Sequence, residues 1–478
     1  MDFAFGPEDT AFRYEARGWL EDRLTGAFAG TAEAAEAAEA AGATGASGAV
    51  GAVGAVGAAG TVGAAGRDGR AGRDGRAGRD GQSGQGVRSG QDGQSGWPGQ
   101  NGQGGQVGHG GGQGGQVGHG GGPGGGHPAT PVRLAWEREL GAAGWIGLGW
   151  DADHGNRRAT LTQQVVWAEE YARAHAPARL GHIGEHLLAP TLIAHGDKEQ
   201  QARHLPGIAR GEEFWCQGYS EPGAGSDLAS VRTTAVADGH RYRVTGQKIW
   251  TSLAREAHWC FVLARTEPGS TRHRGLSFLL VPMDQPGRID VRPIRQMSGT
   301  SEFNEVFFDG AEAAGTVGGE GNGWRVAMGL LALERGVSTL AQQIGFEEEL
   351  GRVVRAAAAG GALDHDPVLR DRLIRQWAEL RTLRWNALRT LGRTGDPGAP
   401  SVAKLLWGGW HRRLGELAVQ VRGAAAAAGP GPWSPSYELD ALQRLFLFSR
   451  ADTIYGGSDE IQRTIIAERV LGLPREPR

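Results

Sequence analysis

The residues best suited to chemistry lie near the middle of the 478-residue chain, in the stretch "WCQGYSEPGAGSDLASVRTTA" (215–235). This stretch contains a Pro-Gly-Ala-Gly turn, and hydroxyl and carboxyl groups flank the turn: Ser220, Glu221, Ser226 and Asp227. A turn of this composition brings backbone N–H groups and short hydroxyls close to an anion such as a pyrophosphate. An ordinary hairpin turn has the same composition, so the stretch alone leaves both interpretations open.

Several common catalytic and metal-binding patterns are absent from the sequence. It contains no G-x-S-x-G, no H-E-x-x-H and no Walker loop. Its only cysteines, Cys216 and Cys260, do not form a Cys-x-x-Cys pair, so we expect neither a disulfide framework nor a metal site. The turn and the later stretch "GQKIWTSLA" (246–254) therefore remain the main candidates for function.

Charge and hydropathy argue against two kinds of partner. The formal net charge is -3 with basic and acidic residues interspersed, so we expect no nucleic acid partner. The start of the chain lacks the basic and apolar segments of a secretion signal, and no later apolar run approaches the length of a membrane span. We therefore expect a cytoplasmic protein without a membrane span.

The spacing of apolar residues predicts helices in both outer parts of the chain. Apolar residues recur at three-to-four spacing over 8–29, and the same period predicts further helices at 161–175, 183–195 and 198–210. The helical period returns from residue 323 and continues to the end of the chain.

Between these helical regions, short alternating or apolar runs predict strands within 240–252, 258–266, 275–283 and 301–311. The sequence thus predicts an α+β fold with an N-terminal helical domain, a middle β-domain and a C-terminal helical bundle. The expected boundaries are 1–30 with 130–212, then 213–321, then 322–478.

A glycine-rich segment interrupts the first domain at 31–129. Glycine recurs at every third position from 42 to 114, broken only at Val87, as in a collagen triple helix. Within that run Pro98 is the only proline, whereas collagen needs proline or hydroxyproline at roughly 15–20%. We predict a disordered insertion, with a weak assembly element as the alternative. Lengthening a loop costs little, because its closure entropy grows only logarithmically with length.

Three groups of motifs, in this order along the chain, resemble the acyl-CoA dehydrogenase family of flavoproteins. They are "HGDKEQQARHLPGIARGE", then "SEPGAGSD" with "GQKIWTSLA", then "YGGSDEIQRTIIAER". The similarity covers 1–30 and 130–478, and several motifs in order are far more specific than any one of them. The family's architecture has the helical, β and helical order predicted above.

The resemblance implies that FAD binds between the β-domain and the C-terminal helices. By motif position, Ser220 would meet the pyrimidine edge of the flavin together with the backbone of Tyr219. Ser226 would lie near the pyrophosphate and the CoA entrance. Trp250 would pack against the isoalloxazine, and Ser252 would bond near flavin N5. A buried core tryptophan is the alternative for Trp250.

In the C-terminal part, the resemblance implies that Ser458 and Glu460 lie near the adenosine half of FAD. Gln420 matches a glutamine that reaches FAD across a dimer interface. The implied partners are an acyl-CoA substrate, an electron-transfer flavoprotein, and further subunits in a homo- or hetero-oligomer. The implied reaction is α,β-dehydrogenation of the thioester to the trans-2-enoyl-CoA, with hydride transfer to flavin N5.

The resemblance also identifies a candidate for the base that removes the α-proton. One branch of the family carries the base directly after the tyrosine of the C-terminal motif, where this chain has Gly456. The other branch keeps it on an internal helix before an arginine, and "LLALERG" supplies Glu334 and Arg335 there. A carboxylate on an apolar helix face has a raised pKa, as such a base requires. A structural Glu–Arg pair is the alternative.

We accordingly expect Glu334 to be the base, the Gly456 N–H to donate to the thioester carbonyl, and Arg335 with Ser226 to contact substrate. This branch of the family includes members with long, branched and bulkier acyl chains. Two further readings are a non-catalytic partner subunit and a collagen-like structural protein. Glu334 opposes the first, and the scarcity of proline opposes the second.

Two stretches depart from the family pattern. "AAAAGGALDHDPVLRDRL" lacks the Arg-x-x-Phe-Gly turn that touches a neighbour's FAD in many members. The Gly-Gly-x-Gly that usually follows the interface glutamine is replaced by "RGAAAAAGPG". Both changes affect the shared half of the cofactor site, so they leave open a heteromeric assembly or a different way of holding FAD.

Overall fold

The computed structural model describes residues 5–29, 130–298, 301–333, 338–390, 398–427 and 439–475, except Ala152 and Asn156. All of these residues belong to one compact unit. The glycine-rich segment predicted at 31–129 lies outside the described residues, and so do Glu334 and Arg335.

The N-terminal region is helical, as predicted. Its helices are α1 (Pro7–Arg23), α3 (Thr130–Ala142), α4 (Leu161–Arg173), α5 (Ala189–His195) and α6 (Lys198–Ala209), with a 3₁₀ turn at Gly26–Phe28 and a π-helix at Gly184–Leu188. Capping residues explain where two of them begin. Thr160 accepts from the N–H of Gln163 to start α4, and Asp197 accepts from that of Gln200 to start α6.

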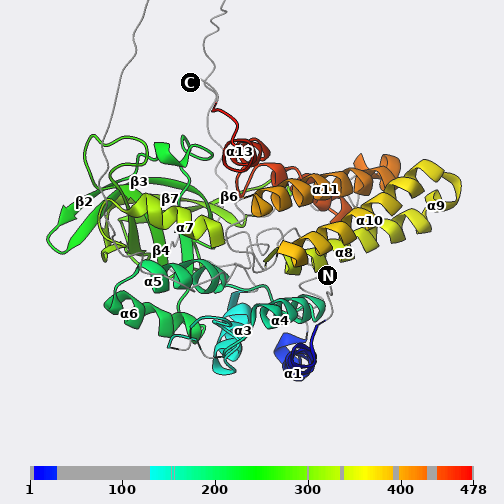
Figure 1. The fold of residues 1–478 in the computed structure, drawn as a ribbon, viewed down its shortest axis with the longest axis horizontal. Helices are drawn as coiled ribbons and strands as arrows, with labels where there is room; N and C mark the ends of the chain where they lie inside the picture. Colours follow the sequence, from blue (N-terminus) through cyan, green and yellow to red (C-terminus); the bar gives the residue numbers. More distant parts are fainter. Residues whose placement is uncertain are drawn as a thin grey trace, which may run out of the picture. The chain divides into compact units, whose positions relative to one another are not determined.

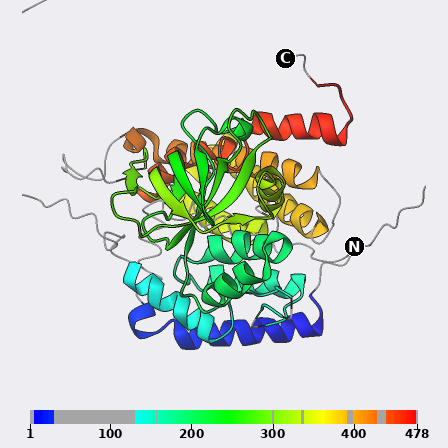
Figure 2. The same cartoon turned by 90° about the vertical axis from the view of Figure 1, so that its left-hand side faces the viewer.

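Tryptophan packing and buried carboxylates hold these helices together. Trp145 and Trp167 stack with ring centroids 4.1 Å apart. The buried Glu169 and Glu170 of α4 both pair with Arg13 of α1, so α1 lies alongside α4 (Figure 2).

The middle region forms one eight-stranded sheet (Figure 1). Its strands are β1 (Trp215–Gly218), β2 (Thr234–Asp238), β3 (Arg241–Ser252), β4 (Trp259–Arg265), β5 (Leu276–Pro282), β6 (Ile289–Ile294), β7 (Phe303–Ala313) and β8 (Thr316–Val317). The sheet order is β6-β7-β3-β2-β4-β5-β8, and β1 pairs in parallel with β4. The sequence predicted the longer β3, β4, β5 and β7. It missed the four shorter strands β1, β2, β6 and β8.

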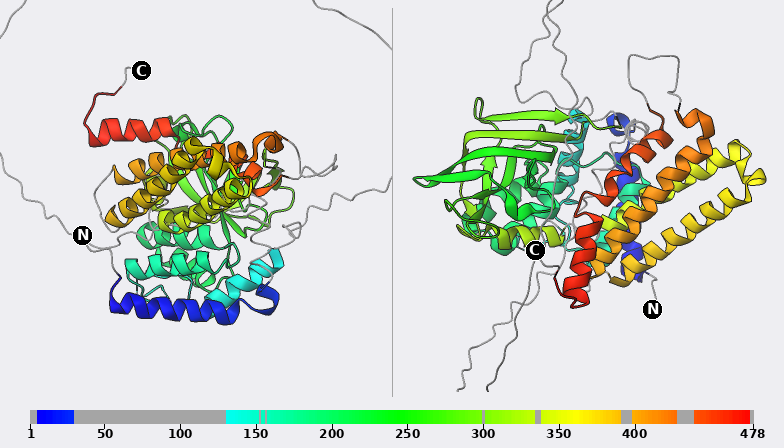
Figure 3. Two further views of the ribbon diagram at one scale, coloured as in Figure 1. Left: turned by 90° about the vertical axis from the view of Figure 1, so that its right-hand side faces the viewer. Right: turned by 90° about the horizontal axis from the view of Figure 1, so that it is seen from above.

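The C-terminal region returns to helices, as predicted. They are α7 (Gly323–Leu333), α8 (Ser338–Ala359), α9 (Ala362–His365), α10 (Pro367–Thr390), α11 (Ala399–Arg422), α12 (Ala441–Phe448) and α13 (Asp459–Ile465), with a 3₁₀ turn at Ala451–Thr453 and a π-helix at Ile466–Val470. The long helices α8, α10 and α11 pack against one another (Figure 3), while α7 packs on β5 of the sheet. Among the helices described here, none is both long and apolar enough to cross a membrane.

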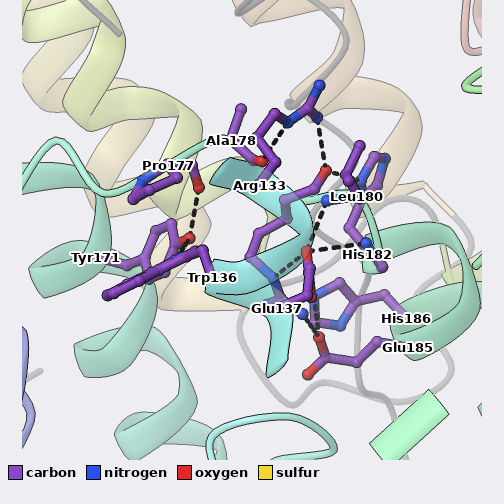
Figure 4. Close-up of polar contacts among 12 residues, drawn as sticks. Arg133, Trp136, Glu137, Tyr171, Pro177, Ala178, Leu180, His182, Glu185 and His186 are labelled. Atoms are coloured by element: carbon purple, nitrogen blue, oxygen red, sulfur yellow. Dashed lines mark hydrogen bonds and ion pairs between the residues drawn. The ribbon is translucent and has the colours of Figure 1, made fainter. Parts of the chain in front are cut away.

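A buried ionic network organises the N-terminal helices around the π-helix (Figure 4). Oε1 of Glu137 accepts from Arg179 Nε (2.9 Å) and from the backbone N–H groups of 180–181 (2.6 and 2.9 Å). Arg179 also donates to Glu185 Oε2 (2.6 Å), and Glu185 Oε1 accepts from the N–H of Gly147 (2.8 Å). The π-helix that carries Glu185 also packs against α7.

Glu137→Ala should lower the free energy of unfolding by about 3–5 kcal/mol, because it leaves the buried Arg179 without one of its two carboxylates. Urea unfolding followed by circular dichroism measures the change. Glu139→Ala, on the same helix and only half-buried, is the matched control and should cost about 1 kcal/mol or less. Equal losses in the two variants would contradict a structural role for the network.

Candidate active site

A buried ion pair connects the two central motifs. Lys248 on β3 is fully buried, and its Nζ donates to Glu221 Oε1 (2.8 Å) and to the carbonyls of Tyr219 (3.0 Å) and Leu263 (2.8 Å). Burial lowers the pKa of Lys248. Burial alone would raise the pKa of Glu221, but the neighbouring ammonium and further hydrogen bonds hold it below its usual value. Each charge is therefore neutralised by its partner and satisfied by backbone groups.

The same carboxylate closes the loop that runs from β1 to β2. Glu221 Oε1 also accepts from the N–H of Thr233 (2.9 Å), and Oε2 accepts from the N–H of Arg232 (2.6 Å). At the start of the loop, Glu221 and Ala224 exchange two backbone hydrogen bonds of 3.0 Å each. The predicted Pro-Gly-Ala-Gly turn is thus a tight turn closed by backbone hydrogen bonds, in a loop whose two ends are joined by the Glu221 side chain.

The tip of this turn is open. A side chain at Gly223 or Gly225 would meet no atom within 4 Å, and Ser226 is exposed. Within the described part of the chain, the N–H groups of these three residues make no hydrogen bond. The tip therefore presents free backbone donors and a hydroxyl to a ligand, as expected for an anion-binding turn.

Trp250 lies next to this turn on a distorted part of β3. The pairing of β3 with β7 shifts register between Lys248 and Thr251, which marks a β-bulge. Trp250 itself has φ of 61°, in the left-handed region, and its side chain is 55% exposed. Its ring makes a T-shaped contact with Phe303, at a centroid distance of 5.9 Å. The alternative of a buried core tryptophan is therefore wrong.

The other β-domain candidates lie beside Trp250. The carbonyl of Ser220 accepts from the N–H of Ile249 (2.9 Å), so Ser220 neighbours the bulge. Ser252 is half-buried and pairs with Phe303 across the sheet. The structure thus brings Tyr219, Ser220, Trp250 and Ser252 together through one ion pair and one strand, with Ser226 at the tip of the adjoining turn.

The C-terminal motif forms a second group. Gly456 and Gly457 have φ of 64° and 85°, which side-chain-bearing residues rarely adopt. The buried Gln462 donates to both of their carbonyls (3.3 and 3.1 Å). The Gly456 N–H makes no hydrogen bond to a described residue, and Gly456 is exposed. It is therefore free to donate to a ligand.

The other predicted residues of this region have local partners. Ser458 caps α13 by accepting from the N–H of Ile461 (3.4 Å). Glu460 is exposed, and hydrogen bonds from its own backbone N–H and from Ser458 lower its pKa. Gln420 lies exposed near the end of α11 and accepts from Arg372 of α10 (2.6 Å).

Sequence reasoning missed a buried charged group behind Gly456. His411 of α11 bridges two carboxylates, with Nδ1 2.6 Å from Asp452 Oδ2 and Nε2 2.7 Å from Glu349 Oε2. The Tyr455 hydroxyl donates to the other oxygen of Asp452 (2.8 Å). A histidine among the apolar positions of "LLWGGWHRRLGEL" was the available signal, but its partners come from segments about 40 and 60 residues away.

Comparison with known proteins identifies the family of this chain. Models of the acyl-CoA dehydrogenase N-terminal, middle and C-terminal domains match 128–212, 216–311 and 321–471. The acyl-CoA dehydrogenase IpdE1 of Mycobacterium tuberculosis is 57% identical over 354 residues, which cover 73% of this chain and 90% of the relative. The chain belongs to the acyl-CoA dehydrogenase family. The predicted resemblance and fold class are thereby confirmed.

Two solved structures of acyl-CoA dehydrogenases have the same fold. The "Tcur3481-Tcur3483 steroid ACAD" aligns with a TM-score of 0.63 and 30% identity, covering 72% of this chain and 89% of that one. The ChsE4-ChsE5 complex from Mycobacterium tuberculosis aligns with a TM-score of 0.62 and 32% identity, covering 72% and 91%. The protein is an FAD-dependent acyl-CoA dehydrogenase, and neither the structural-protein nor the non-catalytic reading is favoured.

The described residues of this acyl-CoA dehydrogenase fit FAD. The open turn tip offers free N–H groups to a pyrophosphate, and the half-exposed Trp250 offers an apolar surface to a flat ring system. Holding a non-glycine residue in the left-handed region costs about 1–3 kcal/mol, and such strain concentrates at ligand sites. The exposure and the strain of Trp250 are thus compatible with a ligand site.

Lys248→Met should yield enzyme with little bound FAD, because it leaves the Glu221 carboxylate buried without its counter-ion and loosens the turn. The ratio of flavin absorbance to protein absorbance after purification measures the loss, expected to exceed tenfold. Gln247→Met, one position away on β3 and hydrogen-bonded to Glu305, is the control and should keep its FAD. Normal flavin content in Lys248→Met would show that the ion pair does not build the site.

The His411 group predicts a pH dependence of stability. Burial alone would lower the pKa of His411, but Glu349 and Asp452 raise it from 6.5 to about 10. The folded state thus holds a proton that the unfolded chain releases. The contribution of protonated His411 to the free energy of unfolding is complete below about pH 6.5, and it is lost as the pH rises towards about 10. Over this interval the melting temperature of the wild type should fall more than that of His411→Gln. Parallel curves would contradict an ionised His411.

Proposed function

We propose that Glu334 is the base of this acyl-CoA dehydrogenase and removes the α-proton of the thioester. It lies outside the described residues, so the proposal rests on its place directly after α7 and before Arg335. Gly456 supports it, because the alternative position for the base has no side chain. We also propose that Arg335 and Ser226 contact the substrate.

Hydrogen bonds from the chain would stabilise the charge that develops on the substrate. The Gly456 N–H would donate to the thioester carbonyl oxygen, where negative charge develops as the α-proton leaves. Loss of one such donor typically costs on the order of 10²–10³ in rate. The chemistry that bound FAD supplies is acceptance of a hydride from the β-carbon, which gives the trans-2-enoyl-CoA.

The exposed, strained Trp250 beside the anchored turn is the observation that carries the proposed flavin site. We propose that Trp250 packs on the isoalloxazine, with Ser252 near N5 and Ser220 and the Tyr219 backbone at the pyrimidine edge. Ser226 and the turn tip would hold the pyrophosphate.

The adenosine half of FAD is assigned to the C-terminal part of the chain. We propose that Ser458 and Glu460 lie near it, and that Gln420 reaches FAD across a subunit interface. Gln420 supports this role by being exposed and held in place by Arg372.

We propose that the acyl group is bulky and derived from a steroid. The support is the similarity to a protein described as a steroid acyl-CoA dehydrogenase. A base on the internal helix is consistent with such an acyl group, since that branch of the family includes enzymes for bulkier chains.

We further propose a heteromeric assembly with a second acyl-CoA dehydrogenase chain, and an electron-transfer flavoprotein as the electron acceptor. ChsE4-ChsE5 is a complex, and Tcur3481-Tcur3483 likewise joins two chain names. One side of α10 supports an interface by exposing Ile374, Trp377 and Trp385 at 59%, 53% and 56%. The altered stretches after α8 and α11 also affect the part of the site that subunits share.

A cytoplasmic location is part of the proposal. Cys216 and Cys260 lie opposite each other on the paired strands β1 and β4, and both are free thiols. A reducing compartment preserves such a pair.

Glu334→Gln should bind FAD normally and lose flavin bleaching by acyl-CoA, because the amide cannot take up the α-proton. The measurement is anaerobic flavin absorbance during titration with a panel of acyl-CoAs that includes bulky, steroid-derived ones. Glu347→Gln, an exposed carboxylate on α8 that pairs with Arg381, is the control and should bleach as the wild type does. Near-normal bleaching of Glu334→Gln would refute the base, and a wild type without flavin would refute the function.

A further inference from the structure

The peptide that carries the Gly456 N–H is the one between Tyr455 and Gly456, so whatever fixes Tyr455 also fixes this donor. The N–H of Tyr455 donates to the carbonyl of Ala451 (3.1 Å), and its hydroxyl donates to Asp452 Oδ1 (2.8 Å). Burial raises the pKa of the Tyr455 hydroxyl, so it remains a donor at every working pH. Both ends of this residue are therefore attached to the 3₁₀ turn Ala451–Thr453.

The 3₁₀ turn Ala451–Thr453 is itself attached to the long helices α8 and α11. Asp452 is fully buried, and its second oxygen receives a hydrogen bond from His411 of α11, which also donates to Glu349 of α8. An imidazole donates at both nitrogens only when both carry a proton, so the group is a carboxylate–imidazolium–carboxylate row, buried at Asp452 and His411 and partly exposed at Glu349. The row connects α8 and α11 rigidly to the turn before Gly456.

Lys404 also contacts the segment that carries Asp452 and Tyr455. Its Nζ contacts the carbonyl of Asp452 and lies 4.6 Å from the ring centroid of Tyr455 and 4.0 Å from that of Trp407. A side-chain carbon at Gly456 would come within 3.7 Å of Lys404 Cε. Tyr455 is thus fixed by its hydroxyl, by its backbone and by a cation on its ring.

We propose that Tyr455 and Asp452, supported by His411 and Glu349, are positioning residues that orient the Gly456 N–H toward the thioester carbonyl. This inference rests on the proposed role of Gly456. None of the four residues touches the reacting atoms, and each acts through the peptide between Tyr455 and Gly456.

Positive φ at two successive glycines explains why positioning residues outside the glycines are needed. Gly456 and Gly457 have no side chains to restrict them, so the loop gains no orientation from its own sequence. Gln462 fixes the carbonyls of both glycines, which orients the peptides after Gly456 and after Gly457. The peptide before Gly456 depends on Tyr455 instead. Buried ion pairs are weak evidence for stability, so the proposal assigns this row a role in positioning instead.

Tyr455→Phe tests the proposal, because it removes one hydroxyl and keeps the ring against Lys404. With the acyl-CoA that bleaches the wild-type flavin fastest, we expect kcat to fall at least tenfold while KM changes less than threefold. The isotope effect of α-deuterated substrate on flavin reduction should increase, because proton removal becomes slower when the developing charge is less well stabilised. FAD content should be unchanged.

Tyr171→Phe is the control, because it removes another buried tyrosine hydroxyl, which donates to the carbonyl of Pro177 and accepts from Trp136 in the N-terminal helices. It should match Tyr455→Phe in melting temperature and keep wild-type kcat. If both variants keep wild-type kcat, or if both lose it equally, the positioning role is wrong.

His411→Gln and the double variant with Tyr455→Phe test whether the row acts through the tyrosine. A single path predicts that the double variant loses no more activity than the worse single variant, whereas independent effects would multiply. Multiplying effects would overturn the proposed row, and if His411→Gln fails to fold, Tyr455→Phe alone decides. Failure of the wild type to bleach would refute the proposed function instead, and normal bleaching in Tyr455→Phe would refute only the positioning.

Discussion

The ion pair between Glu221 and Lys248 is the constraint on which the candidate flavin site depends. One carboxylate connects the two ends of the loop from β1 to β2, and one ammonium attaches that carboxylate to β3. Both charges are buried, so neither can leave its partner without a large desolvation cost. The free N–H groups at the turn tip and the exposed ring of Trp250 are consequently fixed relative to each other.

A similar arrangement recurs in the C-terminal helices. There the Glu349–His411–Asp452 row attaches an irregular loop to two long helices. In both places the backbone that would meet a ligand belongs to glycine-containing loops, which have little intrinsic rigidity. Buried charges with complete hydrogen bonding supply that rigidity from the neighbouring regular elements. Stabilising the charge that develops in a transition state requires preorganised donors, because such donors do not have to reorient during the reaction.

The N-terminal helices contribute by position. Their buried network around Glu137 and Arg179 holds the π-helix that packs on α7. A motif comparison does not single out the residues of this network, because their contacts join segments that are far apart in the chain.

Much of this protein follows from local sequence. The helical periods and the long strands were predicted because each is repeated over many residues, and the family was identified because short motifs such as "SEPGAGSD" occur in order. The same motifs named Ser220, Trp250 and Gly456. The strands β1, β2, β6 and β8 were missed, and β1 and β8 are the shortest of them, with four and two residues.

What local sequence left open depends on contacts between distant segments. Nothing near His411 indicates that Glu349 and Asp452 flank it, and nothing near Trp250 indicates that a bulge turns its ring outward. The exposure of Trp250 and the free N–H of Gly456 are likewise properties of a packed chain, because burial and hydrogen bonding depend on every segment that comes near. Residue types and their order therefore determined the family and the candidate residues. Folding decided which buried charges hold those residues, since an ion pair exists only where tertiary packing brings its two halves together.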